Sequence, residues 1–535
     1  WEFDRLNFTV WQVDMFLEKD ILWVHPKITN PRPIDLRGYW WTCVAMRVEE
    51  SGKTRIVTPA DLSITPCTAW PSGAYTLANV SFRGSDIDSC DKSDGGTCAW
   101  QQDMSYLGNI PFAHDFFMFK AGQETKYPHR PQQPYIAHVL EDGYTVVHGH
   151  PLNGTKFFTW GEADFGTFQQ DFMSDSDYQN PKCFKDMEVP HYDPYCKDYE
   201  HVGKYTELQI GPARSQMHTF PLPKWTNETK GEYQWTEWFK GYQANASLMH
   251  SNDYNVPLTH VLNWMDGVDG IPAETIKSTD AWLKEMSSVA PKPENILFKG
   301  TEWGGLHEKL TGKPLAAGCP FELMNTNKTR PWIELLETGK FSTTTKSSVP
   351  ESFLIADAWL SLLKRSLAKE PSWLTYLYIG TALLERGEVD ASTDLLTKSM
   401  SMKPSIHAAR ALAVSAPDDE TARAYFLEAW SVFKLSKKTE ETIRLGTNLA
   451  SELTIWLTYK ELWTDLKQLF ADIDLTADMR VKDRVLHARI ALAIEESNAT
   501  STSTSTYINI DMYIYIYVYM YIYIYIESHD DNQPP

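Results

Sequence analysis

The chain has 535 residues, enough for about three domains, and its hydrophobic fraction of 42% can supply a sizeable core. Its net charge is −20 and no basic cluster interrupts the acidic composition. An acidic chain of this kind argues against nucleic acid and anionic membrane surfaces as partners.

Residues 1 to about 240 are expected to form a β domain. Polar and apolar residues alternate over residues 9–17. Further strands are expected at residues 21–29, 39–46, 144–148, 156–160, 205–210 and 233–239. Gly, Pro and Asp turns separate these segments without helical periods between them, which predicts a large antiparallel sandwich. Trp and Tyr crowd this half, where they either fill the core or stack on sugar rings.

Residues 241–350 form a mixed connecting region in this interpretation. Residues 274–286 have a helical period, and a short helix is expected at 332–336. Residues 299–307 are expected to form a loop punctuated by glycines, and residues 342–348 a polar linker.

Residues 351–497 are expected to form a helical-repeat domain. Periods of 3.6 residues occur at 353–367, 373–386, 389–402, 406–413, 419–433 and 440–449. One segment fits the 34-residue tetratricopeptide pattern at Tyr376, Ile379, Gly380, Leu383, Gly387, Ser392, Leu396, Ser399 and Pro404. Small residues at these offsets let paired helices approach closely. An ordinary helical bundle is the alternative.

Residues 498–535 are expected to be a low-complexity, disordered tail. A Ser/Thr repeat precedes a stretch in which Tyr alternates with Ile, Val or Met. This stretch is too short and too rich in Tyr for a membrane helix. An alternating T-A dinucleotide tract read in frame encodes the same repeat, so we interpret the tail as read-through of repetitive DNA.

Cysteines and glycosylation sequons both favour a secreted or endomembrane-lumenal protein. Cys90 and Cys98 bracket one loop and Cys183 and Cys196 another, as disulfide staples do. Zinc is the rival interpretation, but no CxxC occurs. Seven sequons, where composition would give roughly three, lie at Asn7, Asn79, Asn153, Asn227, Asn245, Asn327 and Asn498. The chain starts at Trp1 without a signal peptide, which we interpret as an N-terminal truncation.

Glu207 is the first candidate for chemistry. Glu207 and Gln209 lie two residues apart in an expected strand, so both side chains point to one face. That face is either a wet surface or the floor of a pocket. In a pocket Glu207 could act as a general base on a sugar hydroxyl, with Asp103 or Glu237 as the partner acid.

Other candidates fit a sugar subsite. Lys156 and Trp160 share a strand face, where a Lys beside a ring suits a polyhydroxyl ligand, although a Lys stem covering a buried Trp gives the same pattern. Trp235 and Glu237 share another face. His150 is expected to be a hydrogen-bonding residue, because no third metal ligand stands at a diagnostic spacing. No P-loop, dinucleotide fingerprint or nucleophile elbow occurs, so neither metal nor cofactor is expected.

Several of these segments resemble a domain-of-unknown-function family. The resemblance lies in residues 39–41, 103–106, 156–161, 207–211 and 235–238, and it extends over residues 1 to about 495. In that family a galactose-mutarotase-like β-sandwich precedes tetratricopeptide-like repeats. Residues 303–307 resemble its junction motif, with His307 in place of an acid, and residues 404–413 resemble a recurrent repeat motif.

A more distant resemblance links the candidate site to aldose 1-epimerases. Glu207, Leu208 and Gln209 are similar to the Glu-Thr-Gln of their late strand, whose Glu is the catalytic base. Where those enzymes carry Asn-His-Ser-Tyr-Phe, this chain has Tyr39 followed by two Trp residues and no His. The resemblance implies a carboxylate kept for a sugar reaction or for binding.

The sequence therefore predicts a galactose-mutarotase-like antiparallel β-supersandwich, truncated at its N-terminus, followed by helical repeats. We expect it to bind a glycan in the β-sandwich cleft, as a glycoside hydrolase or epimerase-like enzyme that uses Glu207. The alternative is a non-catalytic glycan-binding or scaffold protein whose repeats dock a protein partner. A third interpretation is an interaction protein whose sandwich is purely structural. Nucleic acid and membrane insertion are not expected.

Overall fold

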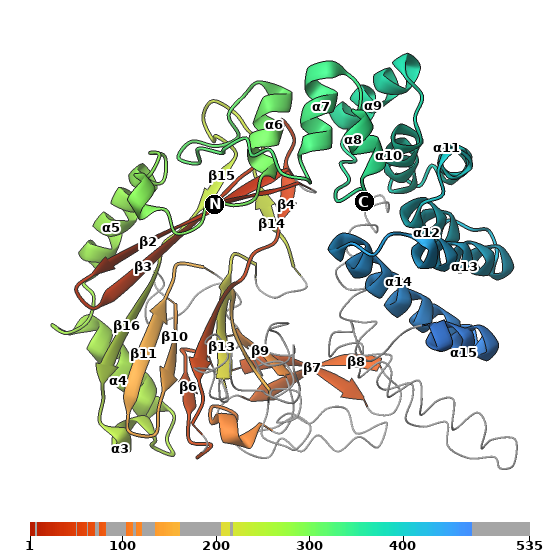
Figure 1. Ribbon diagram of the computed structural model, residues 1–535. Coiled ribbons are helices and arrows are strands. Elements are labelled where there is room, and N and C mark those ends of the chain that lie inside the picture. Colours follow the sequence, from red (N-terminus) through yellow and green to blue (C-terminus); the bar gives the residue numbers. More distant parts are fainter. Residues whose placement is uncertain are drawn as a thin grey trace, which may run out of the picture. The chain divides into compact units, whose positions relative to one another are not determined.

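The structure is a computed structural model in which the chain divides into two compact units, Trp1–Glu337 and Thr338–Pro535 (Figure 1). The first unit contains antiparallel sheets and helices, and the second is helical, so the expected multidomain β + α organisation is confirmed. The described residues are 1–5, 8–49, 51–60, 62–69, 74–81, 103–110, 114–119, 134–152, 154–160, 205–213 and 218–472. The disulfide loops and tail expected from the sequence lie outside them.

The larger sheet has eight strands: β1 Glu2–Asp4, β2 Thr9–Glu18, β3 Ile21–Thr29, β6 Arg55–Val57, β10 Tyr135–Val139, β11 Tyr144–Gly149, β15 Glu232–Gln234 and β16 Glu237–Gln243. Their order is β1-β2-β3-β16-β11-β10-β6, and β15 also pairs with β3. Every pairing in this sheet is antiparallel.

The smaller sheet has six strands: β5 Thr42–Arg47, β7 Leu62–Ala69, β8 Ala74–Ser81, β9 His114–Phe119, β12 Gly154–Thr159 and β13 Tyr205–Gly211. Their order is β5-β13-β12-β9-β7-β8. A separate two-stranded ribbon joins β4 Leu36–Gly38 to β14 Phe220–Leu222.

Most expected strands are confirmed, with two differences. The segment expected at residues 39–46 becomes extended only at Thr42. The segment expected at 233–239 is two strands, β15 and β16, interrupted at Trp235 and Thr236. The side chains of Trp235 and Thr236 are engaged in separate hydrogen bonds at this break.

The described part of the first unit also contains the α-helices α3 Ala246–Met249, α4 Asn255–Asp266, α5 Ala273–Met286, α6 Trp303–Thr311 and α7 Arg330–Thr338, whose last residue passes the unit boundary. On β16, Glu237 accepts a hydrogen bond from Thr42 of the smaller sheet, whereas Tyr242 stacks on Trp264 of α4. Residues 237 and 242 lie on opposite faces of the strand. The larger sheet therefore has the smaller sheet on one face and helices on the other.

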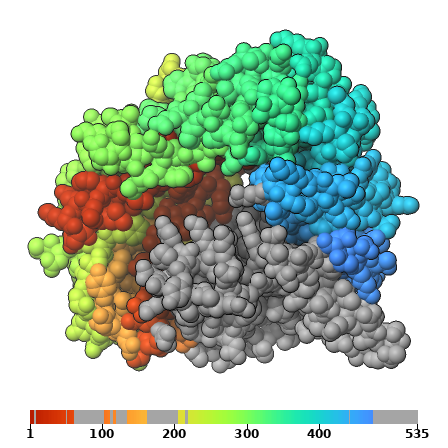
Figure 2. Space-filling view, viewed as in Figure 1, coloured from red at the N-terminus to blue at the C-terminus, as the bar shows by residue number. Residues whose placement is uncertain are grey.

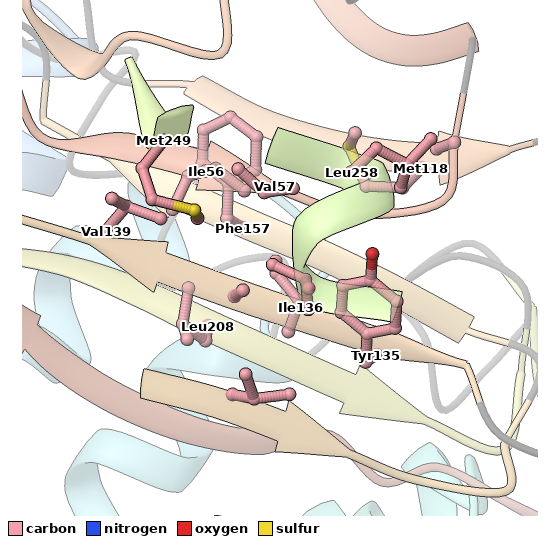
Figure 3. Packing of buried hydrophobic residues seen from close by; sticks show 14 of the residues in the cluster. Ile56, Val57, Met118, Tyr135, Ile136, Val139, Phe157, Leu208, Met249 and Leu258 are labelled. Carbon is pink, nitrogen blue, oxygen red and sulfur yellow. The ribbon is translucent and has the colours of Figure 1, made fainter. Parts of the chain in front are cut away.

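One hydrophobic core joins these three layers. Figure 3 shows Phe157 and Leu208 of the smaller sheet packed with Ile136 and Tyr135 of β10 and with Met249 of α3. These side chains are buried. Burying a side chain of this size contributes about 1.5–3 kcal/mol, so the cluster fixes the two sheets and the helices as one unit.

A buried lysine ties the segment after α5 to the edge of the larger sheet. Lys27 Nζ donates to the carbonyl oxygens of Ser287, at 2.6 Å, and Ala317, at 3.3 Å. Gln12, opposite Lys27 in the β2–β3 register, donates to the same Ser287 oxygen. Figure 2 shows the result, with the green helical segment lying against the red N-terminal strands.

Two segments expected to be irregular contain helices. The expected loop at 299–307 contains the start of α6, because its glycines allow a close approach rather than a turn. A Cβ at Gly304 would lie 2.0 Å from the Phe321 ring, and one at Gly305 would lie 2.2 Å from Glu322 O. The expected linker at 342–348 contains α8 Thr343–Ser347, whose N-terminus is capped by Ser342.

The second unit is built from α8 and the helices α9 Asp357–Lys369, α10 Trp373–Leu384, α11 Val389–Met402, α12 Ile406–Val414, α13 Asp419–Leu435, α14 Glu440–Tyr459 and α15 Trp463–Asp472. Each helix expected in this part is confirmed, and α14 runs ten residues beyond its expected end at 449.

The helices α10 and α11 form an antiparallel pair at the positions where the sequence pattern predicted close packing. A Cβ at Gly380 would lie 2.8 Å from Leu396 Cγ, so the two helices approach closely. Ser392 Oγ donates to Gly380 O and Ser399 Oγ donates to Trp373 O, both at 2.8 Å. The small residues thus allow direct contact between side chain and backbone across the pair.

The helical unit should lose stability in mild acid through His407. Burial lowers the pKa of His407 to about 4 from 6.5. The unfolded chain therefore takes up a proton below pH 6.5 that the folded chain rejects, and stability falls as pH falls towards 4. Between pH 7 and pH 5 this group alone should remove about 2 kcal/mol.

Urea unfolding at pH 7 and pH 5 measures this loss. His407→Leu should reduce the pH dependence, whereas His218→Asn, at an exposed histidine, should leave it unchanged. An identical pH dependence for wild type and His407→Leu would contradict the assignment.

Candidate functional site

The strand β13 divides its side chains between the core and an exposed face, as its alternating pattern predicted. Leu208 and Ile210 are completely buried. Glu207 and Gln209 therefore point away from the larger sheet. The surface on which they lie is called the outer face of the smaller sheet.

Strand register extends the outer face across four strands. In one row Phe117, Lys156, Gln209 and Cys43 are neighbours, and in the next row Asp115, Phe158, Glu207 and Ala45 are neighbours. Cys43 and Ala45 are exposed, whereas Lys156 is buried. The face is thus most accessible along β5, half-buried at Glu207, and most enclosed at Gln209 and Lys156.

A buried ion pair lies at the enclosed side. Lys156 Nζ is 2.6 Å from Asp115 Oδ1, and the Lys156 side chain has no exposed surface. The Trp41 and Phe117 rings lie 5.4 Å and 5.3 Å from the ammonium, within cation–π range. Burial lowers the pKa of Lys156, and the Asp115 carboxylate opposes that shift. The structure therefore shows Lys156 as the cation of an ion pair between two rings.

Glu207 and Gln209 are linked directly. Gln209 Nε2 donates to Glu207 Oε2 at 2.6 Å. A carboxylate accepts only, so this bond fixes the orientation of the Gln209 amide. Gln209 is 4% exposed, yet its Oε1 has no hydrogen-bond partner among the residues that the structure describes. A buried acceptor without a partner is uncommon and marks a place where a ligand or water hydrogen could bind.

The Trp41 ring lies directly on the backbone of two paired glycines. Gly154 and Gly211 are opposite each other in the β12–β13 register. A Cβ at Gly154 would lie 2.8 Å from Trp41 Cη2, and a Cβ at Gly211 would lie 2.9 Å from Trp41 Cδ2. The two glycines therefore set the position of this ring beside Lys156.

Trp160 lies on the outer face as expected, at the end of β12. Its ring makes edge contacts with Phe158 at 4.9 Å and Tyr205 at 6.1 Å between centroids. Within the described part of the chain, the buried Nε1 donors of Trp160 and Trp41 have no hydrogen-bond partner of good geometry. The outer face thus combines unpaired donors on rings with an unpaired acceptor on Gln209.

Glu237 and Trp235 are not on this face. Glu237 is completely buried and accepts hydrogen bonds from Trp235 Nε1 at 2.6 Å, Thr42 Oγ1 at 2.8 Å and His148 Nε2 at 3.1 Å. Thr42 is paired with Ile210, which points into the core, whereas Glu207 points to the outer face. Glu237, which is bonded to Thr42, therefore lies on the opposite face of the smaller sheet from Glu207. The expected pairing of these two carboxylates is therefore absent.

His150 lies with Glu237 on the inner side. Its Nδ1 accepts a hydrogen bond from the Leu152 N–H, and its Nε2 is 3.1 Å from Thr155 Oγ1. Burial, together with the neighbouring His148, lowers the pKa of His150 well below its usual value, so the ring is neutral. Among the described residues, no group of His, Cys, Asp and Glu side chains could hold a metal ion.

Asp103 lies neither on the outer face nor beside Glu237, but next to the buried Arg55. Arg55 donates to Asp103 Oδ2 at 3.2 Å, to Ser105 Oγ, and to the carbonyl oxygens of Met249 and Ser251. The Tyr106 ring covers the guanidinium at 4.5 Å. This cluster ties the segment 103–110 to α3, and it gives Asp103 a structural partner.

Sequence reasoning missed Asp115, Phe117 and Trp41. The signal at residues 114–119 was weak, because two polar residues are followed by four apolar ones without alternation. In a strand there, Asp115 and Phe117 share a face by the argument used for Glu207 and Gln209. Trp41 carried no such signal, because its place depends on two glycines more than 100 residues away.

Comparison with known proteins gives little. Neither a family model nor a curated protein sequence matches the chain. The crystal structure of a TPR-domain containing protein from Parabacteroides distasonis ATCC 8503 is similar at 13% identity and a TM-score of 0.45, covering 89% of this chain. The chain spans 63% of that protein's length. A likeness at this level assigns neither family nor activity. Among the described residues, no helix has the length and apolar content needed to cross a bilayer.

Glu237 should stabilise the fold without contacting a ligand. Glu237→Gln would set an amide N–H₂ against a hydrogen-bond donor in the core, which should lower the free energy of unfolding by about 2 kcal/mol. Urea unfolding measures this change, with Glu18→Gln at an exposed site as the control. An unfolding free energy of Glu237→Gln equal to that of wild type would contradict this structural role.

Proposed function

We propose that the chain is a carbohydrate-binding protein whose ligand lies on the outer face of the smaller sheet, against Glu207 and Gln209. The observation that carries this proposal is the unpaired Gln209 Oε1, held in place by its bond to Glu207. A sugar hydroxyl can donate to that oxygen and accept from a ring N–H at the same time.

The rings of the outer face support the same proposal. Trp41 and Trp160 are partly exposed and flank the polar residues. Aromatic rings beside hydrogen-bonding groups suit ligands with an apolar ring face and a polar edge. A pyranose has both, so stacking and hydrogen bonding would act on one ligand.

A catalytic form of the proposal uses Glu207 as the base. The other charged residues near it in the strand register are Lys156, Arg47 and Asp115, of which Asp115 and Lys156 replace Asp103 and Glu237 as partner candidates. Asp115 and Glu207 lie on strands separated by one intervening strand, so their Cα atoms are roughly 9–10 Å apart. The separation of the two carboxyl groups would decide the mechanism, since about 5–5.5 Å is typical of retaining and about 6.5–9.5 Å of inverting glycosidases.

The remaining expectations from the sequence complete the proposal. The two sheets would form a sandwich of the galactose-mutarotase type. The paired helices of the second unit would act as tetratricopeptide-like repeats that bind a protein partner. Exposed sequon residues Asn227, Asn245 and Asn327 favour a secreted or lumenal location.

A glycan panel tests the proposal. Wild type should bind a subset of glycans, and Gln209→Leu should weaken that binding about tenfold because it removes a neutral hydrogen bond. Glu207→Gln should weaken binding by about tenfold to a hundredfold, since a charged acceptor is lost. Isothermal titration of the glycans selected on the panel gives the dissociation constants.

Turnover assays on the same glycans separate the two forms of the proposal. Turnover that disappears in Glu207→Gln while some binding persists would support an enzyme. Binding without turnover in wild type would support a binding protein. Glu18→Gln serves as the matched control far from the site. No binding to any glycan, or binding unaffected by both site variants, would contradict the proposal.

A further inference from the structure

We propose that the sugar bound on the outer face is rich in hydroxyl groups and carries no acidic group. The proposal rests on the function proposed above and narrows its ligand class. Two features of the described residues support it: the Lys156 ammonium is already paired with Asp115, and the polar groups at Glu207 and at Gln209 Oε1 accept hydrogen bonds.

Lys156 is the cation that an acidic sugar would be expected to use, but Asp115 occupies it. The ammonium is 2.6 Å from Asp115 Oδ1 and lies between the Trp41 and Phe117 rings. A ligand carboxylate would have to displace Asp115 and leave that carboxylate without its cation. The Lys156 side chain is fully buried and that of Asp115 is 25% exposed, so this exchange is unfavourable and should weaken the binding of an acidic sugar.

The groups left for a ligand favour hydrogen-bond donors. The Glu207 carboxylate uses one oxygen for Gln209 Nε2, and Gln209 Oε1 has no partner. Both can only accept. Sugar hydroxyls supply the donors that these oxygens need. A uronate or sulfate would bring further acceptors and a like charge towards Glu207, and like charges brought together disfavour binding.

Arg47 is the second described cation on this face. Arg47 and Cys43 lie on the same face of β5. Arg47 is paired with Tyr205, in the row next to that of Glu207. Arg47 is exposed, so salt screens its field. It provides an internal comparison for the buried Lys156, because an acidic sugar could reach Arg47 without breaking an ion pair.

Matched sugar pairs test the inference. The probes are short oligosaccharides of glucose against glucuronic acid, and of galactose against galacturonic acid, titrated at pH 7 in about 0.15 M salt, where the charge of exposed Arg47 is screened. Wild type should bind the neutral member of at least one pair about tenfold or more tightly than the acidic member. Asp115→Asn removes a carboxylate and releases the ammonium, so it should narrow that ratio about tenfold by strengthening binding of the acidic sugar. Arg47→Gln should change the ratio less than about twofold.

A second variant keeps the test decisive if Asp115→Asn does not fold. Glu207→Gln removes the like charge without disturbing the Lys156 pair, and it should also narrow the neutral-to-acidic ratio. Wild type that binds the acidic member as tightly as the neutral one would overturn this inference while leaving glycan binding intact. If no member of either pair binds, and the wider panel is also negative, the proposed function itself fails.

Discussion

The pleat of β13 imposes the constraint on which the first unit depends. Each successive side chain must face the opposite side of the smaller sheet, so Leu208 and Ile210 can enter the core only if Glu207 and Gln209 face outwards. Hydrophobic burial therefore positions the polar residues. A slip of one residue in register would exchange the two sets, which the buried core strongly opposes.

Polar groups inside the fold are handled in the opposite way. Glu237, Arg55 and Lys27 are completely or almost completely buried, and each has several hydrogen-bond partners of suitable geometry. These residues link layers of the unit: sheet to sheet, loop to helix, and strand to the segment after α5. Gln209 differs, because its amide nitrogen is satisfied and its oxygen is not. That contrast separates a residue available to a ligand from residues that hold the structure together.

The segments that the sequence predicted as strands or helices are largely present because period and turn chemistry are local, but β1, β4, β6–β10 and β14 were not predicted. The sequence also predicted correctly that Glu207 shares a face with Gln209 and that Lys156 shares a face with Trp160. It could not predict the partners of Glu207. Asp103 and Glu237 have the carboxyl group that a partner acid needs. Which carboxylates lie together depends, however, on the strand order and on the face to which each side chain points, and these are properties of the whole sheet. The prediction was wrong for the glycine-rich segment at 299–307. Gly304 and Gly305 lie within a helix, where the lack of a side chain lets Phe321 and Glu322 pack closely against it.

The packing of Trp41 against the backbone of two glycines has a consequence for recognising relatives of this chain. The Trp41 indole contacts main-chain atoms at Gly154 and Gly211. A change of side-chain rotamer at these two positions therefore cannot alter the distance of the indole from the sheet. Any homologue that keeps this platform must lack a side chain at both positions, whatever its overall identity. The pair of glycines, 57 positions apart, would then be a more dependable signature of the binding surface than the carboxylate beside it.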